Sequence, residues 1–357
     1  TNKVKGAPIA VTKAHIASGT VQAVIVNSGN ANTCNIDGEE KAEEMCRLAA
    51  RALGLNITDV AVASTGVIGE ILPIEPIASA VPALAKGLSV AGHDQAARAI
   101  MTTDTVKKEV AVSFLLDGKT VTVGGMAKGS GMIHPNMATM LCFLTTDAAI
   151  EQPLLQLALS AVVKDTFNMV SVDGDTSTND TVLLMASGKA GNPAIADIDS
   201  PAYKAFVNAL YVVLMNLSRM IAKDGEGASK LLECTVTGAE NEQAAKTVAK
   251  SVITSSLFKC AMFGKDPNWG RILCAVGYAP ANLNPDEVSV SLSSTGGTIC
   301  VCENGRGVPV DKEKAAAVLL PDEIKILISL GDGEGRAVAW GCDLTYDYVK
   351  INADYHT

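Results

Sequence analysis

A glycine-rich stretch in the middle of the sequence leads to a threonine that could act as a nucleophile. Residues 124–134 are rich in glycine and carry Lys128, and Thr139 follows a small residue, Ala138, at the start of an apolar run. The Thr139 hydroxyl could attack the carbonyl group of Ala138, and hydrolysis of the resulting ester would leave Thr139 as a new N-terminus. Such a threonine carries nucleophile and base in one residue, because an α-amine has a pKa of about 7.7–8.0 and can accept the hydroxyl proton. The pattern alone also fits a β-branched strand residue without a catalytic role.

Other polar residues lie in predicted turns and loops, where they could contact a small molecule. Thr65-Gly66 follows a short apolar run, and there a hydroxyl and a backbone N–H could donate to a developing oxyanion. A plain turn explains the same residues. Glu226 lies between two glycines just beyond a predicted helix, and Lys128 lies on the predicted glycine-rich loop. Both positions are also typical of solvated surface residues.

The sequence argues against a metal site or a nucleotide site. Residues 173–179 resemble the opening of an EF-hand loop, but Thr178 replaces the required glycine and Leu184 replaces the terminal glutamate. The glycine-rich segment 331–335 lacks the Lys-Ser/Thr of a Walker loop, and we predict a hairpin turn there. The four histidines are dispersed, and His134 is interpreted as a loop residue.

Composition limits the class of protein. The chain has 357 residues, of which 48% are hydrophobic, and a net charge of −9, with no cluster of Lys and Arg to follow a phosphate backbone. Nine cysteines without a C-x-x-C motif predict reduced, buried thiols. No apolar run reaches the about 18 residues of a membrane span. We therefore expect a cytoplasmic protein with neither nucleic acid nor membrane as a partner.

The elements that must position the candidate residues alternate between helices and strands. Helices are predicted at 38–53, 74–87, 92–101, 151–165, 200–222, 242–258 and 311–318. Strands are predicted at 21–26, 60–63, 109–116, 119–124, 139–145, 181–186, 230–237, 286–292, 298–303, 324–330 and 336–341. Asp117-Gly118 is expected to close a hairpin. This mixture predicts an α/β (α+β layered) fold, with a larger sandwich-like domain of mixed sheet and helices and a smaller C-terminal α+β domain, roughly 235–342.

The central stretch 124–147 and six further blocks resemble one known family. The blocks, in chain order, are VNSGNAN (26–32), STGVIG (64–69), MTTDT (101–105), DGDTSTNDT (173–181), FGKDPNWGR (263–271) and INADY (351–355). Together they span the whole chain and resemble the ornithine acetyltransferases, the glutamate N-acetyltransferases of the arginine pathway. In that family the Ala-Thr bond of the central stretch is cut.

The resemblance implies an acyltransferase with a ping-pong mechanism. The bond between Ala138 and Thr139 would be cut by the chain itself, and Thr139 would carry the acetyl group of N-acetylornithine as an ester before passing it to glutamate. Thr65 and Gly66 match the oxyanion hole of the family. The positions that match its substrate-binding residues are Thr102, Lys128, Thr139, Glu226, Asn352 and Thr357.

The resemblance also implies specific roles and an assembly. Lys128 would pair with the substrate α-carboxylate, and Glu226 would bind the side-chain ammonium of ornithine. Segments 1–138 and 139–357 would remain together after cleavage as the α and β chains of an α2β2 heterotetramer. No metal and no cofactor are expected, and use of acetyl-CoA as a second acetyl donor stays open.

Two other classes of protein stay open at this point. An N-terminal-nucleophile aminopeptidase or amidohydrolase would share the self-cleavage but would pass the acyl group to water. A metabolite-binding protein without catalytic activity would keep an uncut chain and would form no acetyl ester.

Overall fold

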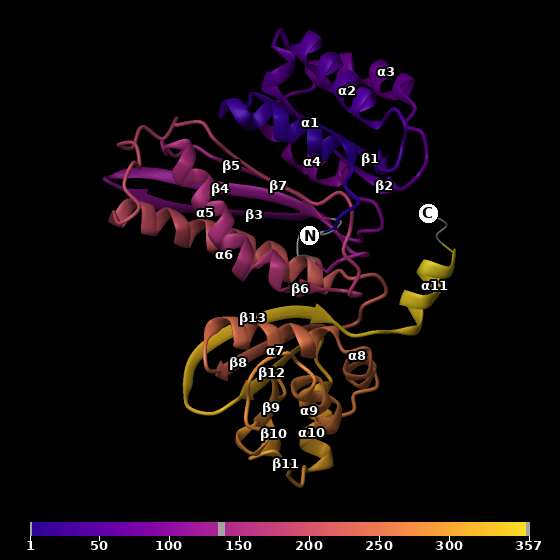
Figure 1. Ribbon diagram of the computed structural model, residues 1–357, viewed down its shortest axis with the longest axis vertical. Coiled ribbons are helices and arrows are strands. Elements are labelled where there is room, and N and C mark those ends of the chain that lie inside the picture. The colour runs from indigo at the N-terminus through magenta and orange to yellow at the C-terminus, as the bar shows by residue number, and fades with distance from the viewer. Residues whose placement is uncertain (1, 135–139, 355–357) are drawn as a thin grey trace. The chain divides into compact units, whose positions relative to one another are not determined.

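The computed structural model describes residues 2–134 and 140–354 (Figure 1). The chain forms two compact units. The first comprises residues up to 162 together with 175–217, and the second comprises 163–174 together with the residues from 218 onward. Helices and strands alternate in both units, so the predicted mixed α/β class is confirmed. The predicted smaller domain lies within the second unit, and the division at the cleavage site stays a prediction.

The first unit contains a two-stranded sheet and a four-stranded sheet. Its strands are β1 (Ala23–Asn30), β2 (Val60–Val67), β3 (Lys108–Leu116), β4 (Lys119–Lys128), β5 (Leu141–Thr146) and β7 (Thr181–Ala186). Its helices are α1 (Ala7–His15), α2 (Gly38–Leu53), α3 (Ile74–Lys86) and α4 (His93–Ala99), and by sequence it shares α5 (Gln152–Asp165) and α6 (Pro201–Lys223) with the second unit. The predictions missed α1.

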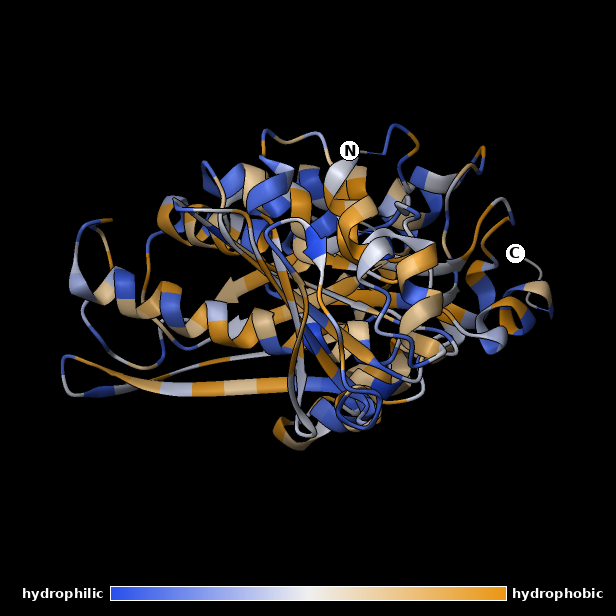
Figure 2. Ribbon diagram, turned by 90° about the horizontal axis from the view of Figure 1, so that it is seen from below, coloured by the Kyte–Doolittle hydropathy of each residue, from blue (hydrophilic) through white to orange (hydrophobic). Residues whose placement is uncertain are grey.

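Helix α2 was predicted correctly because its sequence carries strong local signals for both of its ends. Glu39 and Glu40 lie in its first turn and Arg51 in its last, which complements the helix dipole. Gly54 ends the helix in the left-handed conformation, with φ of 69°. The buried face of α2 packs on β2 and α3, and Figure 2 shows helices that alternate between hydrophobic and hydrophilic residues, as expected for helices with one buried face.

The parallel pair β1–β2 extends further than predicted. Thr65 and Gly66 were expected in a turn after the strand, but they are strand residues that lie opposite Ser28 and Gly29 of β1. The close approach of the two strands requires glycine at this position, because a Cβ atom on Gly66 would lie 2.2 Å from the carbonyl carbon of Gly29.

The four-stranded sheet has the order β3-β4-β5-β7, and its hairpin is confirmed. Asp117 and Gly118 close β3 and β4 with positive φ at both residues, 47° and 76°, as in a tight two-residue turn. The expectation of a loop at the glycine-rich stretch was wrong up to Lys128, because β4 continues through it. The absence of a side chain at Gly125 makes room for Leu144 of the paired strand β5, since a Cβ atom there would lie 2.4 Å from Leu144 Cδ2.

The second unit contains a seven-stranded mixed sheet of order β11-β10-β9-β12-β8-β13-β6. The strands are β6 (Val170–Ser171), β8 (Leu231–Gly238), β9 (Ser289–Ser294), β10 (Gly297–Glu303), β11 (Arg306–Gly307), β12 (Glu323–Ser329) and β13 (Gly333–Cys342). The helices are α7 (Glu242–Thr254), α8 (Ser256–Phe263), α9 (Trp269–Gly277), α10 (Lys312–Leu319) and α11 (Tyr346–Asp354). The predicted helix 242–258 is two helices, because Ser255 ends α7 and caps α8 by accepting from the Phe258 N–H.

The predicted hairpin at 331–335 is wrong. Strands β12 and β13 do not pair with each other but lie on either side of β8. The glycines instead allow two backbone segments to lie close together. A Cβ atom on Gly333 would lie 2.0 Å from the Ala239 carbonyl oxygen, and a Cβ atom on Gly335 would lie 2.2 Å from the Asn241 carbonyl oxygen. The segment thus passes against the residues that follow β8.

Helix α6 departs from the expectation that no segment could cross a membrane. It has 23 residues and a mean hydropathy of 1.5, so its length and composition would suffice for a span. Half of that window is buried within the protein, and the core helix of a soluble protein passes the same test. Its buried residues recur at helical spacing, as in Phe206, Leu210, Val213, Leu214 and Leu217. Helix α6 is therefore weak evidence for a membrane segment.

Replacement of Thr12 by valine should destabilise the first unit. The buried Thr12 hydroxyl of α1 donates to the Val62 carbonyl (2.6 Å) and accepts from the Val62 N–H (2.7 Å), so it pairs the outer edge of β2. Thr12→Val would leave both groups buried and unpaired, and should lower the free energy of unfolding by about 1–3 kcal/mol. Urea denaturation would measure it, with Thr12→Ser, which keeps the hydroxyl, as the control. Equal stability of the two variants would contradict this account of the edge.

Candidate active site

Two predicted substrate-binding residues meet at the end of β4. The Lys128 ammonium donates to the Thr102 hydroxyl at 2.8 Å and lies 3.7 Å from a carboxylate oxygen of Asp104. Lys128 is 2% exposed, although the sequence suggested a solvated lysine as the ordinary case. A buried ammonium group held in place is suited to pairing with a carboxylate that enters from outside.

Asp104 and Lys108 complete this cluster, and the sequence analysis did not identify either. The Asp104 carboxylate pairs with the fully buried Lys108 at 2.7 Å and accepts from the Gly129 N–H at 2.7 Å. Burial alone would raise the pKa of Asp104, but the charges of Lys128 and Lys108 and these hydrogen bonds lower it overall. Asp104 is thus ionised at neutral pH. Asp104 lies in a loop and Lys108 begins β3, so their four-residue separation is not a helical pairing and no local signal in the sequence marks the pair.

The predicted oxyanion-hole residues lie at the end of β2. Thr65 is 1% exposed, and within residues 2–134 and 140–354 its hydroxyl has no hydrogen-bond partner. The Gly66 backbone has a φ of 132°. A buried hydroxyl without a hydrogen-bond partner destabilises the folded protein. Its presence here therefore favours a role as a hydrogen-bond donor to a bound molecule.

Asn179 holds the end of β2 in place. Its side-chain amide donates to the carbonyl oxygens of Ala31 (2.6 Å) and Ser64 (3.0 Å), and its oxygen accepts from the Thr33 hydroxyl (2.6 Å). Asn179 is 3% exposed, so these bonds satisfy groups that water does not reach. The carbonyl group that precedes Thr65 is therefore fixed by a residue more than a hundred positions away in the sequence.

Asp180, the next residue, holds the start of β5. Its Oδ1 accepts from the Met140 N–H at 2.7 Å, and Met140 is the residue that follows Thr139. Burial raises the pKa of Asp180 well above that of an ordinary carboxyl, although the Met140 N–H opposes the shift. Ala138 and Thr139 themselves lie outside the described residues. The loop that ends in Asn179-Asp180 thus contacts both the end of β2 and the residue next to the predicted nucleophile.

Glu226 and Asn352 meet in the second unit. The Asn352 side-chain amide donates to a carboxylate oxygen of Glu226 at 2.8 Å, and both residues are exposed to some degree. Helix α11 reaches this position because Thr345 donates to the Gly227 carbonyl at 2.6 Å and because Gly227 has no side chain. A Cβ atom there would lie 2.5 Å from the Tyr348 nitrogen. Two predicted substrate-binding residues are thus brought together, while Thr357 lies outside the described residues.

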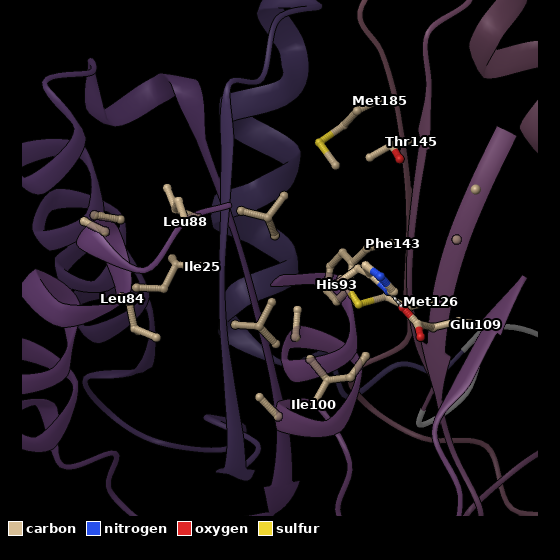
Figure 3. Close-up of a pocket in the computed structure, with 18 of the residues that line it drawn as sticks. Ile25, Leu84, Leu88, His93, Ile100, Glu109, Met126, Phe143, Thr145 and Met185 are labelled. Atoms are coloured by element: carbon tan, nitrogen blue, oxygen red, sulfur yellow. Dashed lines mark hydrogen bonds and ion pairs between the residues drawn. The ribbon is translucent and has the colours of Figure 1, made fainter. Parts of the chain in front are cut away.

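The first unit also contains a partly open pocket of about 750 Å³, which none of the predicted site residues line (Figure 3). Apolar side chains line most of it, among them Ile100, Phe143 and Met185. Its polar groups include His93 and Glu109, which bond to each other at 2.9 Å (Figure 3). Such a lining suits burial of apolar surface.

The cysteines and possible metal ligands add no second site. All nine cysteines are free thiols, and burial raises the pKa of Cys46 to about 12, so its thiolate does not form at neutral pH. The prediction of buried thiols is wrong for the exposed residues Cys34, Cys260, Cys274 and Cys300. In the part of the chain that the structure describes, no three of His, Cys, Asp and Glu are grouped to hold a metal ion.

Comparison with known proteins agrees with the resemblance carried by the sequence blocks. The ArgJ family matches residues 1–357. The arginine biosynthesis bifunctional protein ArgJ 1 of Clostridium acetobutylicum is 50% identical over 358 residues, which cover 100% of this chain and 88% of that protein. ArgJ of Symbiobacterium thermophilum gives the same identity and coverage.

A solved structure supports the same conclusion. The crystal structure of the arginine biosynthesis bifunctional protein ArgJ from Bacillus halodurans is 46% identical in sequence, with a TM-score of 0.57. The match covers 60% of this chain and 98% of the crystal chain. The chain described here therefore belongs to the ArgJ family, the ornithine acetyltransferases of arginine biosynthesis.

Proposed function

We propose that the protein transfers the acetyl group of N-acetylornithine to glutamate through an ester on Thr139, after the chain has cleaved itself between Ala138 and Thr139. The observation that carries this proposal is the loop Asn179-Asp180. Asn179 binds the end of β2 at Ser64, and Asp180 binds Met140. These bonds hold the oxyanion-hole candidates and the chain beside Thr139 within one buried network.

The proposed cleavage creates the nucleophile. Thr139 Oγ1 attacks the carbonyl carbon of Ala138, the amide C–N bond breaks, and water hydrolyses the ester, leaving a carboxylate on Ala138 and a free α-amine on Thr139. Residues 139–357 make up three fifths of the chain. The crystal chain from B. halodurans matches 60% of this chain over 98% of its own length, a size that agrees with such a fragment.

In the proposed transfer, the α-amine of Thr139 accepts the proton of its own hydroxyl. Thr139 Oγ1 attacks the acetyl carbonyl of N-acetylornithine, the C–N bond breaks, and ornithine leaves with the proton on its nitrogen. The amine of glutamate then attacks the ester, giving N-acetylglutamate and restoring Thr139. Thr65 and Gly66 would donate to the oxyanion in both half-reactions.

Recognition of the two amino acids rests on opposite charges. The buried Lys128 ammonium, held by Thr102 and Asp104, would pair with the α-carboxylate that both substrates share. Glu226, which Asn352 contacts, would bind the side-chain ammonium of ornithine. Thr357 completes the proposed set of substrate-binding residues. We propose no metal and no cofactor.

The proposal also covers the assembly, the location and the acetyl donors of the enzyme. The fragments 1–138 and 139–357 would remain associated as an α2β2 heterotetramer in the cytoplasm. The relatives from C. acetobutylicum and S. thermophilum are named bifunctional. This name favours a second acetyl donor, for which we propose acetyl-CoA. An amidohydrolase would share the cleavage and the ester but would release acetate, so the product separates the two functions.

Intact mass spectrometry tests the nucleophile. The wild-type protein should give fragments that end at Ala138 and begin at Thr139, and brief incubation with N-acetylornithine, or in a second sample with acetyl-CoA, should add one acetyl group to the latter. Thr139→Ala should stay uncut and unacetylated, because it has no hydroxyl. Thr139→Ser keeps the hydroxyl and should still be cut. Cleavage and transfer by Thr139→Ala would refute the mechanism, and acetylation by only one donor would decide the question of acetyl-CoA.

Replacement of Thr65 by valine tests the oxyanion hole. The change keeps the shape but removes the hydroxyl donor, so kcat for N-acetylglutamate formation should fall by about 10²–10³, the typical loss for one such donor. Thr65→Ser retains a hydroxyl and should lose much less. The measurement requires protein that mass spectrometry shows to be cut. A Thr65→Val enzyme with the kcat of the wild type would exclude Thr65 from the oxyanion hole.

Replacement of Glu226 by glutamine tests recognition of ornithine. Loss of the charge should raise KM for N-acetylornithine about tenfold, the equivalent of one charge-assisted hydrogen bond, and should affect KM for glutamate much less. Glu240→Gln, a change at an exposed glutamate in the same unit, serves as the control. An equal change in KM for both substrates in Glu226→Gln would mean that Glu226 does not recognise the ammonium group of ornithine.

A further inference from the structure

Self-cleavage poses a chemical problem that the transfer reaction does not. Before cleavage, the nitrogen of Thr139 belongs to an amide, whose lone pair is delocalised into the carbonyl group. It cannot accept the hydroxyl proton as the free α-amine does later. Another group must therefore take this proton when Thr139 Oγ1 attacks Ala138, if the chain cuts itself as proposed above.

Asp180 is bound to Met140, the residue that follows the proposed nucleophile in the sequence. Its Oδ1 accepts from the Met140 N–H at 2.7 Å, and that nitrogen is part of the peptide bond that joins Thr139 to Met140. Its Oδ2 is buried and has no hydrogen-bond partner among residues 2–134 and 140–354. Asp180 is 8% exposed, so water does not satisfy this oxygen either.

The position of Asp180 is fixed on both sides. The Thr181 N–H donates to the Met140 carbonyl at 3.0 Å, so consecutive residues bind both backbone groups of Met140. On the other side, Asn179 is bound to Ser64 and to Thr33. Buried hydrogen bonds therefore hold the backbone on both sides of Asp180, and the carboxyl group can turn away only by losing its bond to the Met140 N–H.

The environment also makes the carboxylate a stronger base than usual. Burial raises the pKa of Asp180, and the Met140 N–H and the charge of Lys128 on β4 oppose this rise less strongly. A carboxylate with a raised pKa accepts a proton from a hydroxyl more readily than an exposed one does.

We propose that Asp180 is the general base of self-cleavage, with Oδ2 accepting the proton of the Thr139 hydroxyl while Oγ1 bonds to the carbonyl carbon of Ala138. The proton then passes to the departing nitrogen as the C–N bond breaks, which yields the ester and the neutral α-amine and leaves Asp180 ionised again. Water hydrolyses the ester in a later step. The inference rests on the proposed function, because Thr139 must be the nucleophile.

A purely structural role for Asp180 makes a different prediction. If the residue only binds the Met140 N–H, asparagine should serve equally well, because its carboxamide oxygen accepts the same hydrogen bond. Asparagine cannot accept the hydroxyl proton, however. Asp180→Asn therefore separates the two roles with little change in shape.

The chain offers a matched control for this substitution. Asp147, just beyond the other end of β5, also accepts a backbone N–H through one carboxylate oxygen, from Thr122 at 2.7 Å. Asp147→Asn makes the same chemical change in the same unit, and it should leave the rate of cleavage unchanged.

The experiment follows the full chain during a pulse of cell-free synthesis, with the cut and uncut forms separated on a denaturing gel and identified by mass. Asp180→Asn should cut about 10²–10⁴ times more slowly than the wild type, the usual contribution of general base catalysis. Added formate, a small carboxylate, should restore cleavage in Asp180→Ala but should not speed cleavage of the wild type. Thermal melting of Asp180→Asn against Asp147→Asn would show whether the variant is folded.

The outcomes separate this inference from the proposed function. Cleavage of Asp180→Asn at the rate of Asp147→Asn would overturn the inference alone, since the wild type would still be cut at Thr139. A wild-type chain that stays uncut would overturn the proposed self-cleavage itself. If Asp180→Asn does not fold, the Asp180→Ala chain decides, because rescue by formate supports the role and the lack of rescue opposes it.

Discussion

The hydrogen bonds of Asn179 and Asp180 are the constraint on which the first unit depends. They join the end of β2 to the start of β5, through bonds between residues that are 40 to 148 positions apart. The groups involved are buried backbone amides and carbonyls, which would be costly to leave unpaired. This loop thus fixes two strands. The end of β2 contains the proposed oxyanion-hole residues, and β5 begins two residues after Thr139 in the sequence.

The cluster around Asp104 also depends on the pairing of buried groups, which here are charged. One buried carboxylate contacts the ammonium groups of Lys108 and Lys128 and accepts from the backbone N–H groups of Thr102 and Gly129. Removal of these charges from water is expensive, so only mutual pairing makes their burial tolerable. The same pairing fixes the position of Lys128, which a flexible surface lysine would not have.

Close backbone approach explains four of the glycines in the glycine-containing segments of the sequence. Gly66 lies against β1, Gly227 lies against α11, and Gly333 and Gly335 lie against the residues after β8. In each case a side chain would collide with another backbone segment, so glycine is required for packing.

The sequence by itself determined the elements whose signals are local and the chemistry that the residue types allow. Charges and a terminal glycine marked α2, the Asp117-Gly118 pair marked the hairpin, and the sequence blocks led to the ArgJ family, as the comparisons confirm. Only the tertiary structure decided that Asp104 binds two lysines, that Asn179 and Asp180 join β2 to β5, and that β8 separates β12 from β13. These features arise from hydrogen bonds, charges and strand pairings between distant residues, and no local pattern encodes which distant groups will be buried together.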